Sequence, residues 1–353
     1  MVKPKREDLN QFLIPHLNTI YDTLQLFDRP APLTQEKVNW NDVLQMSDHL
    51  SKQATIVGML WTGENPKAES LKETMESYFN ALQGFLLCCH GSTVGAGSTL
   101  SSIIHVSVKQ IVDSSFRLLQ GSVSLYEGSY EKGKKPSIPQ LSGVVWEACS
   151  GFKKVPATNI IAIGRGITQV AVSMKDVLRE MKEVKPACAL PEGEASGGND
   201  DSDEDLGDDL SPEEMEVAQM VAEIVSDTLT VIKELIRVIT GMIKLENPKD
   251  NSGFVDSLEK LLKLCQGTGV QIDELGACVY PPQELNKMRQ TVKIMQGNLE
   301  EVESEVKRLT NSPDAFSEAC GKLQNSMKQM DTELDKRCEA EVVVEMQNVT
   351  LGN

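Results

Sequence analysis

The sequence predicts an all-α protein made of two antiparallel helical bundles, about five helices each, joined by an acidic flexible linker. Three observations support this. Aromatic residues are only 5% of the chain, which disfavours the sandwiches and barrels that such residues fill. Long segments repeat apolar residues at helical spacing. The length of 353 residues exceeds what one hydrophobic core usually supports, so two domains are expected.

Prolines mark the ends of the expected helices, because proline breaks a helix interior but is tolerated in a first turn. The first set of helices is predicted at residues 5–27, 34–61, 67–90, 98–127, 139–154 and 157–184. The second set is predicted at residues 212–245, 252–266, 270–279, 282–309 and 314–346. Pro15 falls inside an otherwise helical pattern, where a break or kink is expected. Gly164 and Gly166 also lie within a helical stretch and indicate close packing or a bend rather than a ligand site.

Charge separates the two predicted bundles. The net charge is −17, and residues 192–216 hold twelve acidic residues but no lysine or arginine. Such a segment buries too little apolar surface to offset its ordering entropy, so we expect a flexible linker. Ser211-Pro212-Glu213-Glu214 has the pattern of a capping box and predicts the start of the next helix. The predicted domains are therefore residues 1–188, a linker at 189–210, and residues 211–353.

The apolar stripes of the second bundle differ in width. The helix at 212–245 is apolar over a wide face, which predicts a central position among several neighbours. The helix at 282–309 has a narrow heptad seam with polar flanks, which is typical of a helix with one partner. The candidate partner-binding seam consists of Leu285, Met288, Val292, Met295, Leu299 and Val302. A hairpin with the helix at 314–346 explains the seam most simply, and a helix from another protein is the alternative.

Motifs of catalysis, cofactor binding or metal binding are not found in the sequence. The four histidines are scattered, no His-Glu-x-x-His is present, and the eight cysteines form no Cys-x-x-Cys pair. We therefore expect a protein that is not an enzyme and holds no cofactor or metal. Ser202, followed by acidic residues, and Ser211, followed by Pro212, are candidate phosphorylation sites.

The charge distribution and the apolar segments also bear on partners and location. Lysine and arginine form no long basic stripe, which disfavours direct nucleic-acid binding. The first residues lack an apolar signal core, and no run of about 18 apolar residues occurs, so no membrane association is expected. Together with cysteines on apolar helical faces, this predicts a reducing cytosol or nucleus.

Two segments carry a family resemblance. Val144–Cys149, followed by Val155-Pro156, and Ile272–Pro282, leading into the next helix, resemble the GCIP-like, cyclin-D-binding family (the Grap and cyclin-D-interacting proteins). The resemblance implies two helical bundles similar in style to vinculin-like bundles. It also implies protein partners, namely D-type cyclins and helix-loop-helix transcription factors, in cytoplasm and nucleus. Such a protein modulates cell-cycle progression and transcription without touching DNA. A vinculin-like cytoskeletal or adhesion scaffold is the alternative function.

Overall fold

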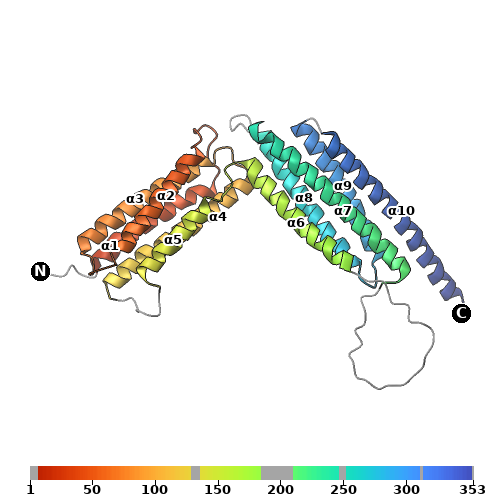
Figure 1. The fold of residues 1–353 in the computed structure, drawn as a ribbon, viewed down its shortest axis with the longest axis horizontal. Coiled ribbons are helices and arrows are strands. Elements are labelled where there is room, and N and C mark those ends of the chain that lie inside the picture. Colours follow the sequence, from red (N-terminus) through yellow and green to blue (C-terminus); the bar gives the residue numbers. More distant parts are fainter. Residues whose placement is uncertain (1–6, 129–135, 184–209, 246–251, 311–312, 352–353) are drawn as a thin grey trace, which may run out of the picture. The chain divides into compact units, whose positions relative to one another are not determined.

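The computed structural model describes residues 7–128, 136–183, 210–245, 252–310 and 313–351. These ranges contain ten α-helices and no β-strand, which confirms the predicted all-α class (Figure 1). None of the helices in them is long and apolar enough to cross a membrane. The chain divides into two compact units, residues 1–162 with 246–255 and residues 163–245 with 256–353. Apart from Leu210, the predicted linker at 189–210 lies outside the described residues.

Five helices make up most of each unit. The first unit contains α1 (Glu7–Leu24), continued by the 3-10 turn η1 (Gln25–Asp28), then α2 (Trp40–Met59), α3 (Ala68–Ser92), α4 (Ser98–Tyr126) and α5 (Ile138–Phe152). The second contains most of α6 (Asn159–Glu183), α7 (Pro212–Gly241) with the turn η2 (Met242–Leu245), most of α8 (Ser252–Cys278), α9 (Leu285–Leu309) and α10 (Asp314–Leu351).

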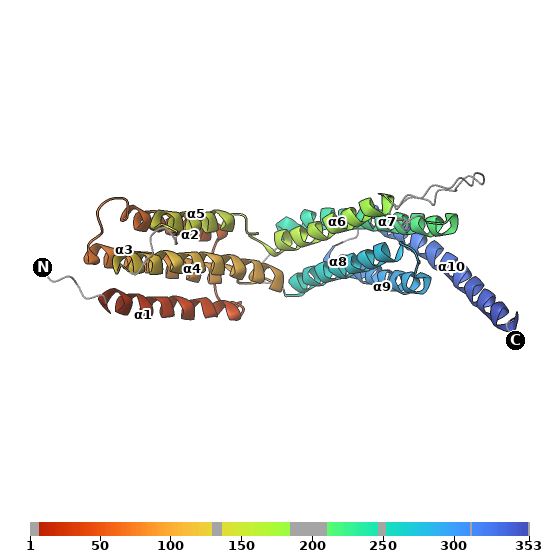
Figure 2. The same cartoon turned by 90° about the horizontal axis from the view of Figure 1, so that it is seen from below.

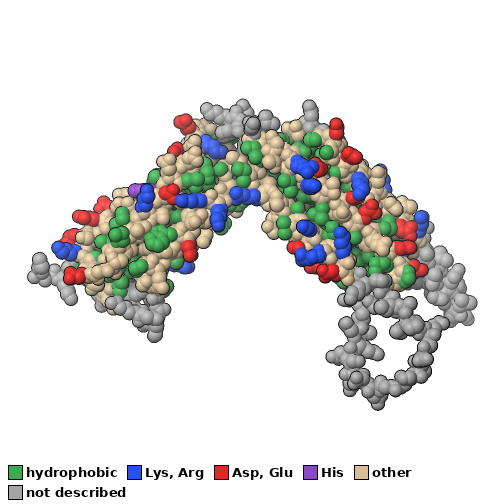
Figure 3. All heavy atoms as spheres, viewed as in Figure 1, with side chains coloured by type: hydrophobic (Ala, Val, Ile, Leu, Met, Phe, Trp, Pro, Cys, Tyr) green, Lys and Arg blue, Asp and Glu red, His purple; other side chains and the backbone are tan. Residues whose placement is uncertain are grey.

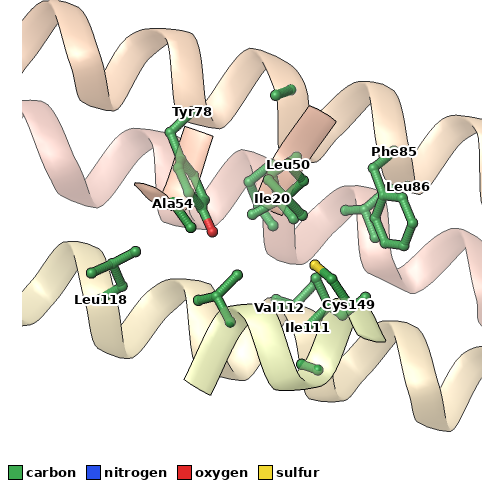
Figure 4. Packing of buried hydrophobic residues seen from close by; sticks show 14 of the residues in the cluster. Ile20, Leu50, Ala54, Tyr78, Phe85, Leu86, Ile111, Val112, Leu118 and Cys149 are labelled. Atoms are coloured by element: carbon green, nitrogen blue, oxygen red, sulfur yellow. The ribbon is translucent and has the colours of Figure 1, made fainter. Parts of the chain in front are cut away.

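The first unit is a bundle in which α2 packs between α3 and α5, α4 packs on α5, and α1 lies on α3 and α4 (Figure 2). All five helices contribute to one core, as the side chains of Ile20, Leu50, Phe85, Ile111 and Cys149 show (Figure 4). The phenol of Tyr78 enters this core and donates a hydrogen bond of 2.8 Å to the Ser115 hydroxyl. A buried polar group is therefore paired inside an otherwise apolar interior.

The second unit is held together along each pair of neighbouring helices. Helix α6 runs beside α8, where glycines bring the two backbones close. Helix α8 is joined to α9 by the ion pair between Lys260 and Glu301, at 3.0 Å. Helix α10 packs against both α9 and α7. The wide apolar face predicted for the helix at 212–245 is confirmed, because Val217, Val221, Ile224, Val231 and Leu235 of α7 are all buried.

The boundary between the units differs from the predicted one at residue 188. The first stretch of the first unit ends at Ala162, so almost all of α6 belongs to the second unit. A Cβ atom placed on Gly166 of α6 would lie 2.8 Å from Leu262 of α8, which shows how closely the two helices pack. The boundary at residue 188 was predicted from the change in composition at the acidic segment. A helix instead belongs to the core that its apolar stripe contacts, and composition does not reveal that contact.

Two helical segments also differ from the prediction. Helix α1 continues through Pro15, so the chain is not broken there. Helix α8 is one helix over Ser252–Cys278, where two segments at 252–266 and 270–279 were predicted. The predicted gap contains Gly267 and Gly269, and glycine weakens helices. In the fold, Gly269 lies against α6, and a Cβ atom there would lie only 3.2 Å from Val170. Close packing explains this glycine, and the helix continues.

Helix α2 starts later than predicted, at Trp40 rather than residue 34. The Asn39 side chain caps it by accepting a 2.8 Å hydrogen bond from the backbone N–H of Asn41. One residue earlier, the N–H of Val38 donates to the carbonyl of Gly91 at the end of α3. The preceding segment is thus tied to α3 by its backbone and does not join the helix.

Candidate partner-binding surfaces

The candidate seam on α9 lies inside the second unit. Met288, Val292, Met295, Leu299 and Val302 are all buried, with Val292 fully inaccessible, and Leu285 at the start of α9 is half-buried. The facing helix is α10, whose own seam residues Phe316, Cys320, Leu323, Met327, Met330 and Leu334 are buried as well. In the structure, α9 therefore forms a hairpin with α10 of the same chain, which is the first of the two explanations that the sequence left open. The seam is not an open docking surface.

Ion pairs on the flanks fix the register of this hairpin. Arg289 of α9 contacts both Asp331 and Asp335 of α10, the former at 3.4 Å. On the other flank of α9, Lys287 reaches Glu274 of α8 at 2.7 Å. These side chains are partly exposed, so each pair contributes little stability by itself. Their arrangement explains the polar flanks of the narrow seam, which complement neighbouring helices of the same chain.

Two buried carboxylates in the second unit were not singled out from the sequence. Asp227 of α7, 3% exposed, accepts hydrogen bonds of 2.8 Å from Lys322 and from Ser326 of α10. Glu305 of α9 is 1% exposed and forms an ion pair of 3.0 Å with Lys260 of α8. The signal in the sequence was an acidic residue within an apolar stripe. Because a buried charge is costly without its partner, these pairs favour one alignment of the helices.

The two candidate phosphorylation sites have different outcomes. Ser202 lies outside the described residues. Ser211 is the N-cap of α7, and its hydroxyl accepts a hydrogen bond from the N–H of Glu214 at 3.2 Å. In return, the Glu214 carboxylate accepts a 2.9 Å hydrogen bond from the N–H of Ser211. The predicted capping box is therefore confirmed. Phosphorylation of Ser211 remains a prediction.

Histidines and cysteines form no metal site in the described part of the chain, where no group of three or more potential ligands occurs. Three of the four histidines instead pack against aromatic rings of the first unit. His16 stacks on Phe79 at 4.9 Å between ring centroids, whereas His90 and His105 both contact Phe27. His49 lies at the edge of an open groove of about 800 Å³ between α2 and α3, lined also by Met46, Glu73, Glu76, Ser77, Asn80 and Ala81.

Burial raises the pKa of several groups that are neutral at pH 7. The pKa of the Cys149 thiol is raised to about 11, and those of Cys265 and Cys320 to about 12. Burial likewise raises the pKa of Tyr78 well above its ordinary value. In each case the apolar surroundings disfavour the charged form more than any other influence does. At alkaline pH these thiols and the Tyr78 phenol therefore stay protonated in the folded state, whereas in the unfolded chain they lose their protons.

We expect both units to lose stability as the pH rises above about 8.5, the ordinary pKa of a thiol. Above that pH the unfolded chain loses thiol protons while the folded chain keeps them, so the free energy of unfolding falls with pH. Melting temperatures between pH 7.5 and 10.5, with a reductant present, measure the effect. Replacing Cys265 and Cys320 by Ala should flatten the pH dependence of the second unit. Equal slopes in both proteins would contradict this explanation.

Exposed apolar side chains are spread over the helices of both units and lie among charged residues (Figure 3). On the first unit, Trp146 of α5 is 44% exposed and donates a 3.1 Å hydrogen bond to Thr55 of α2. Ile56 and Met59 of α2 are also exposed. Ile14 and Tyr21, seven residues apart on α1, are more than half exposed. On the second unit, Val270 of α8 and Ile294 of α9 are more than half exposed.

Comparison with known proteins identifies relatives of both halves of the chain. The model of the N-terminal region of Grap2 and cyclin-D-interacting proteins matches residues 42–187. The model of the C-terminal region of the same proteins matches residues 197–304. The cyclin-D1-binding protein 1 homolog of Xenopus laevis is 22% identical over 277 residues, which cover 76% of this chain and 78% of the relative. The two models match in order and together span most of the sequence, so the chain belongs to the Grap2 and cyclin-D-interacting family.

Proposed function

We propose that this protein is a non-enzymatic regulator that binds D-type cyclins and helix-loop-helix transcription factors and thereby modulates cell-cycle progression and transcription. The observation that carries the proposal is the match of both halves to the cyclin-D-interacting family, together with a relative whose name records cyclin D1 binding. By this proposal it works in the cytoplasm and the nucleus, through contact between proteins.

The physical character of the chain supports binding without contact to DNA. Its net charge is −17, most of it in residues 192–216, and Lys and Arg form no long basic stripe that would neutralise a phosphate backbone. Exposed apolar side chains such as Trp146, Ile56 and Met59 offer contact area to another protein. A helix-loop-helix factor removed from DNA by such contacts loses its effect on transcription, although the regulator never touches the duplex.

Binding of purified proteins tests the proposal. We expect saturable binding of the full-length chain to a D-type cyclin and to a helix-loop-helix factor in a solution titration. In a DNA mobility assay, the chain alone should leave the DNA unshifted and should release a bound helix-loop-helix factor from it. Co-sedimentation with filamentous actin, without binding to the cyclin, would contradict the proposal and favour a vinculin-like scaffold.

A further inference from the structure

Within the first unit, helix α1 and its extension η1 lie on α3 and α4 as an amphipathic helix lies on the surface of a partner protein. Its buried face consists of Leu9, Leu13 and Ile20, each at most 3% exposed, and Phe12, Leu17, Leu24 and Phe27 pack beside them. The facing helices are α3 and α4. Apolar residues at intervals of three and four are the anchors by which a helix is recognised in an apolar groove. The chain therefore contains its own example of this binding mode.

The surface under α1, called here the α1-covered face, is lined by Phe79 and His90 of α3, His105 of α4 and Glu127, the C-cap residue of α4. Phe79 stacks on His16 of α1 at 4.9 Å between ring centroids. The ring of Phe27 contacts His90 edge-on at 5.7 Å and stacks on His105 at 5.6 Å. Aromatic rings thus contact the extended helix at its middle, through His16, and at its C-terminal end, through Phe27. Such rings suit bulky apolar side chains in general.

Polar attachment of α1 is sparse. Asn10 donates a 2.6 Å hydrogen bond to Glu127, directly after α4, but no ion pair joins α1 to α3 or α4 within the described residues. Pro15 has no backbone N–H, so the hydrogen-bond ladder of α1 lacks one member at its middle. By contrast, α2 is tied to α5 by an ion pair between Asp48 and Lys153 and by the Trp146 hydrogen bond. Helix α1 is held chiefly by apolar contact.

The family comparison separates α1 from the rest of the first unit. The N-terminal family model begins at residue 42, within α2, so α1 and η1 lie outside the matched region while α2 to α5 lie inside it. The part of the bundle that is shared with the family is thus the part that presents the α1-covered face. Removal of α1 leaves a four-helix arrangement in which α2, α3, α4 and α5 still contact one another.

We propose that the α1-covered face is a binding site for an amphipathic helix of a partner protein, and that α1 is an internal competitor that must detach before the partner binds. The partner helix carries bulky apolar residues at the spacing of Leu9, Leu13, Ile20 and Leu24. The apparent affinity for the partner is the affinity of the open site multiplied by the fraction of molecules in which α1 is detached. Loosening α1 therefore tightens partner binding. Only the identity of the partner rests on the proposed function. The helix-binding site itself can be tested with a peptide, whether or not that function is correct.

A labelled peptide of residues 7–28 is the direct probe of the site, added to the full-length protein. Replacing Leu13 and Ile20 by Ala removes buried contacts of the internal helix, and we expect this variant to bind the peptide at least about tenfold more tightly than the wild type. The matched control replaces Ile14 and Tyr21 by Ala, which lie on the same helix but are 55% and 58% exposed. This control should bind the peptide as the wild type does. Equal affinity of all three proteins would overturn the proposal.

Hydrogen exchange of the wild-type protein gives a second measurement that needs no substitution. Amides of α1 should exchange faster than those of α3 and α4, because α1 detaches while the other helices stay folded. An excess of isotopically heavy peptide should accelerate α1 exchange further by occupying its place. Exchange of α1 only together with α3 and α4, unchanged by the peptide, would overturn the proposal even if the Leu13 and Ile20 variant failed to fold.

The partner measurement separates this inference from the proposed function. A helix-loop-helix factor should bind the Leu13→Ala, Ile20→Ala variant about tenfold more tightly than the wild type, and the peptide of residues 7–28 should compete with it. Equal binding to both proteins, without competition, would show that this face is not the partner site. If the peptide binds but neither the factor nor a D-type cyclin does, the proposed function fails while the helix-binding site stands.

Discussion

Replacing Val292 by Asp should unfold the second unit and leave the first one intact. Val292 lies at the centre of the α9 seam and is fully buried against α10. A carboxylate at this position would be buried among the apolar seam residues, without a cation among them to compensate for the loss of hydration. The expected loss is about 4 kcal/mol or more, a large part of the stability of an ordinary domain.

The chain provides both the measurement and the control for this prediction. Its three tryptophans, Trp40, Trp61 and Trp146, all belong to the first unit, so their fluorescence reports that unit alone. Far-ultraviolet circular dichroism reports the helices of both. We expect Val292→Asp to reduce helicity while the fluorescence melting curve is unchanged. Ile294→Asp, two residues away and 51% exposed, should change neither signal.

The outcome also decides between the two explanations of the seam. A Val292→Asp protein that melts like the wild type but no longer binds a D-type cyclin would show that the seam serves a partner in solution. The sequence alone left both explanations open because a narrow heptad stripe has the same pattern in either case. Whether the facing helix belongs to the same chain depends on the loop between α9 and α10 and on the flanking charges, such as Arg289 opposite Asp331.

Most helices could be predicted because their signals are local. The capping box at Ser211, the proline at position 212 and the stripe of α7 are all visible in neighbouring residues. The gap predicted within α8 contains Gly267 and Gly269, which have low intrinsic helix propensity. Contact with another helix, here Val170 of α6 against Gly269, outweighs that propensity, and such contacts join residues about a hundred positions apart in sequence. The contact of Gly166 in α6 with Leu262 in α8 is likewise not visible in the composition from which the boundary at residue 188 was predicted.

The candidate binding sites were harder to predict than the helices. A stripe on α9 shows that a helix is amphipathic, but it does not show whether another part of the chain already covers the stripe. The α1-covered face could not be foreseen at all, since Phe79, His90 and His105 are far from α1 in sequence and come together only in the bundle. Asp227 was visible as an acidic residue in an apolar stripe, although its partners Lys322 and Ser326 were not.

The assignment of α6 to the second unit predicts opposite effects at two neighbouring glycines. Gly164 has no atom within 4 Å of the position where a Cβ would lie, apart from its own helix backbone and chain neighbours. Gly164→Ala should therefore stabilise the second unit by up to about 1 kcal/mol through helix propensity. At Gly166 the added methyl group would lie 2.8 Å from Cδ1 of Leu262 and 3.2 Å from Cδ2, so the α6–α8 contact must widen.

Gly166→Ala gains the same helix propensity as Gly164→Ala but adds overpacking, which costs about 1–3 kcal/mol. We therefore expect it to be less stable than Gly164→Ala by about that amount, measured by urea unfolding followed by circular dichroism. The tryptophan signal, which reports the first unit, should be the same in both variants. If Gly166→Ala instead shifts the tryptophan transition, α6 packs in the first unit in solution, as the boundary at residue 188 implied. Gly166→Ala combined with Leu262→Ala supplies the last check, because removing the opposing side chain makes room for the methyl group and should reduce the difference between the two glycine sites.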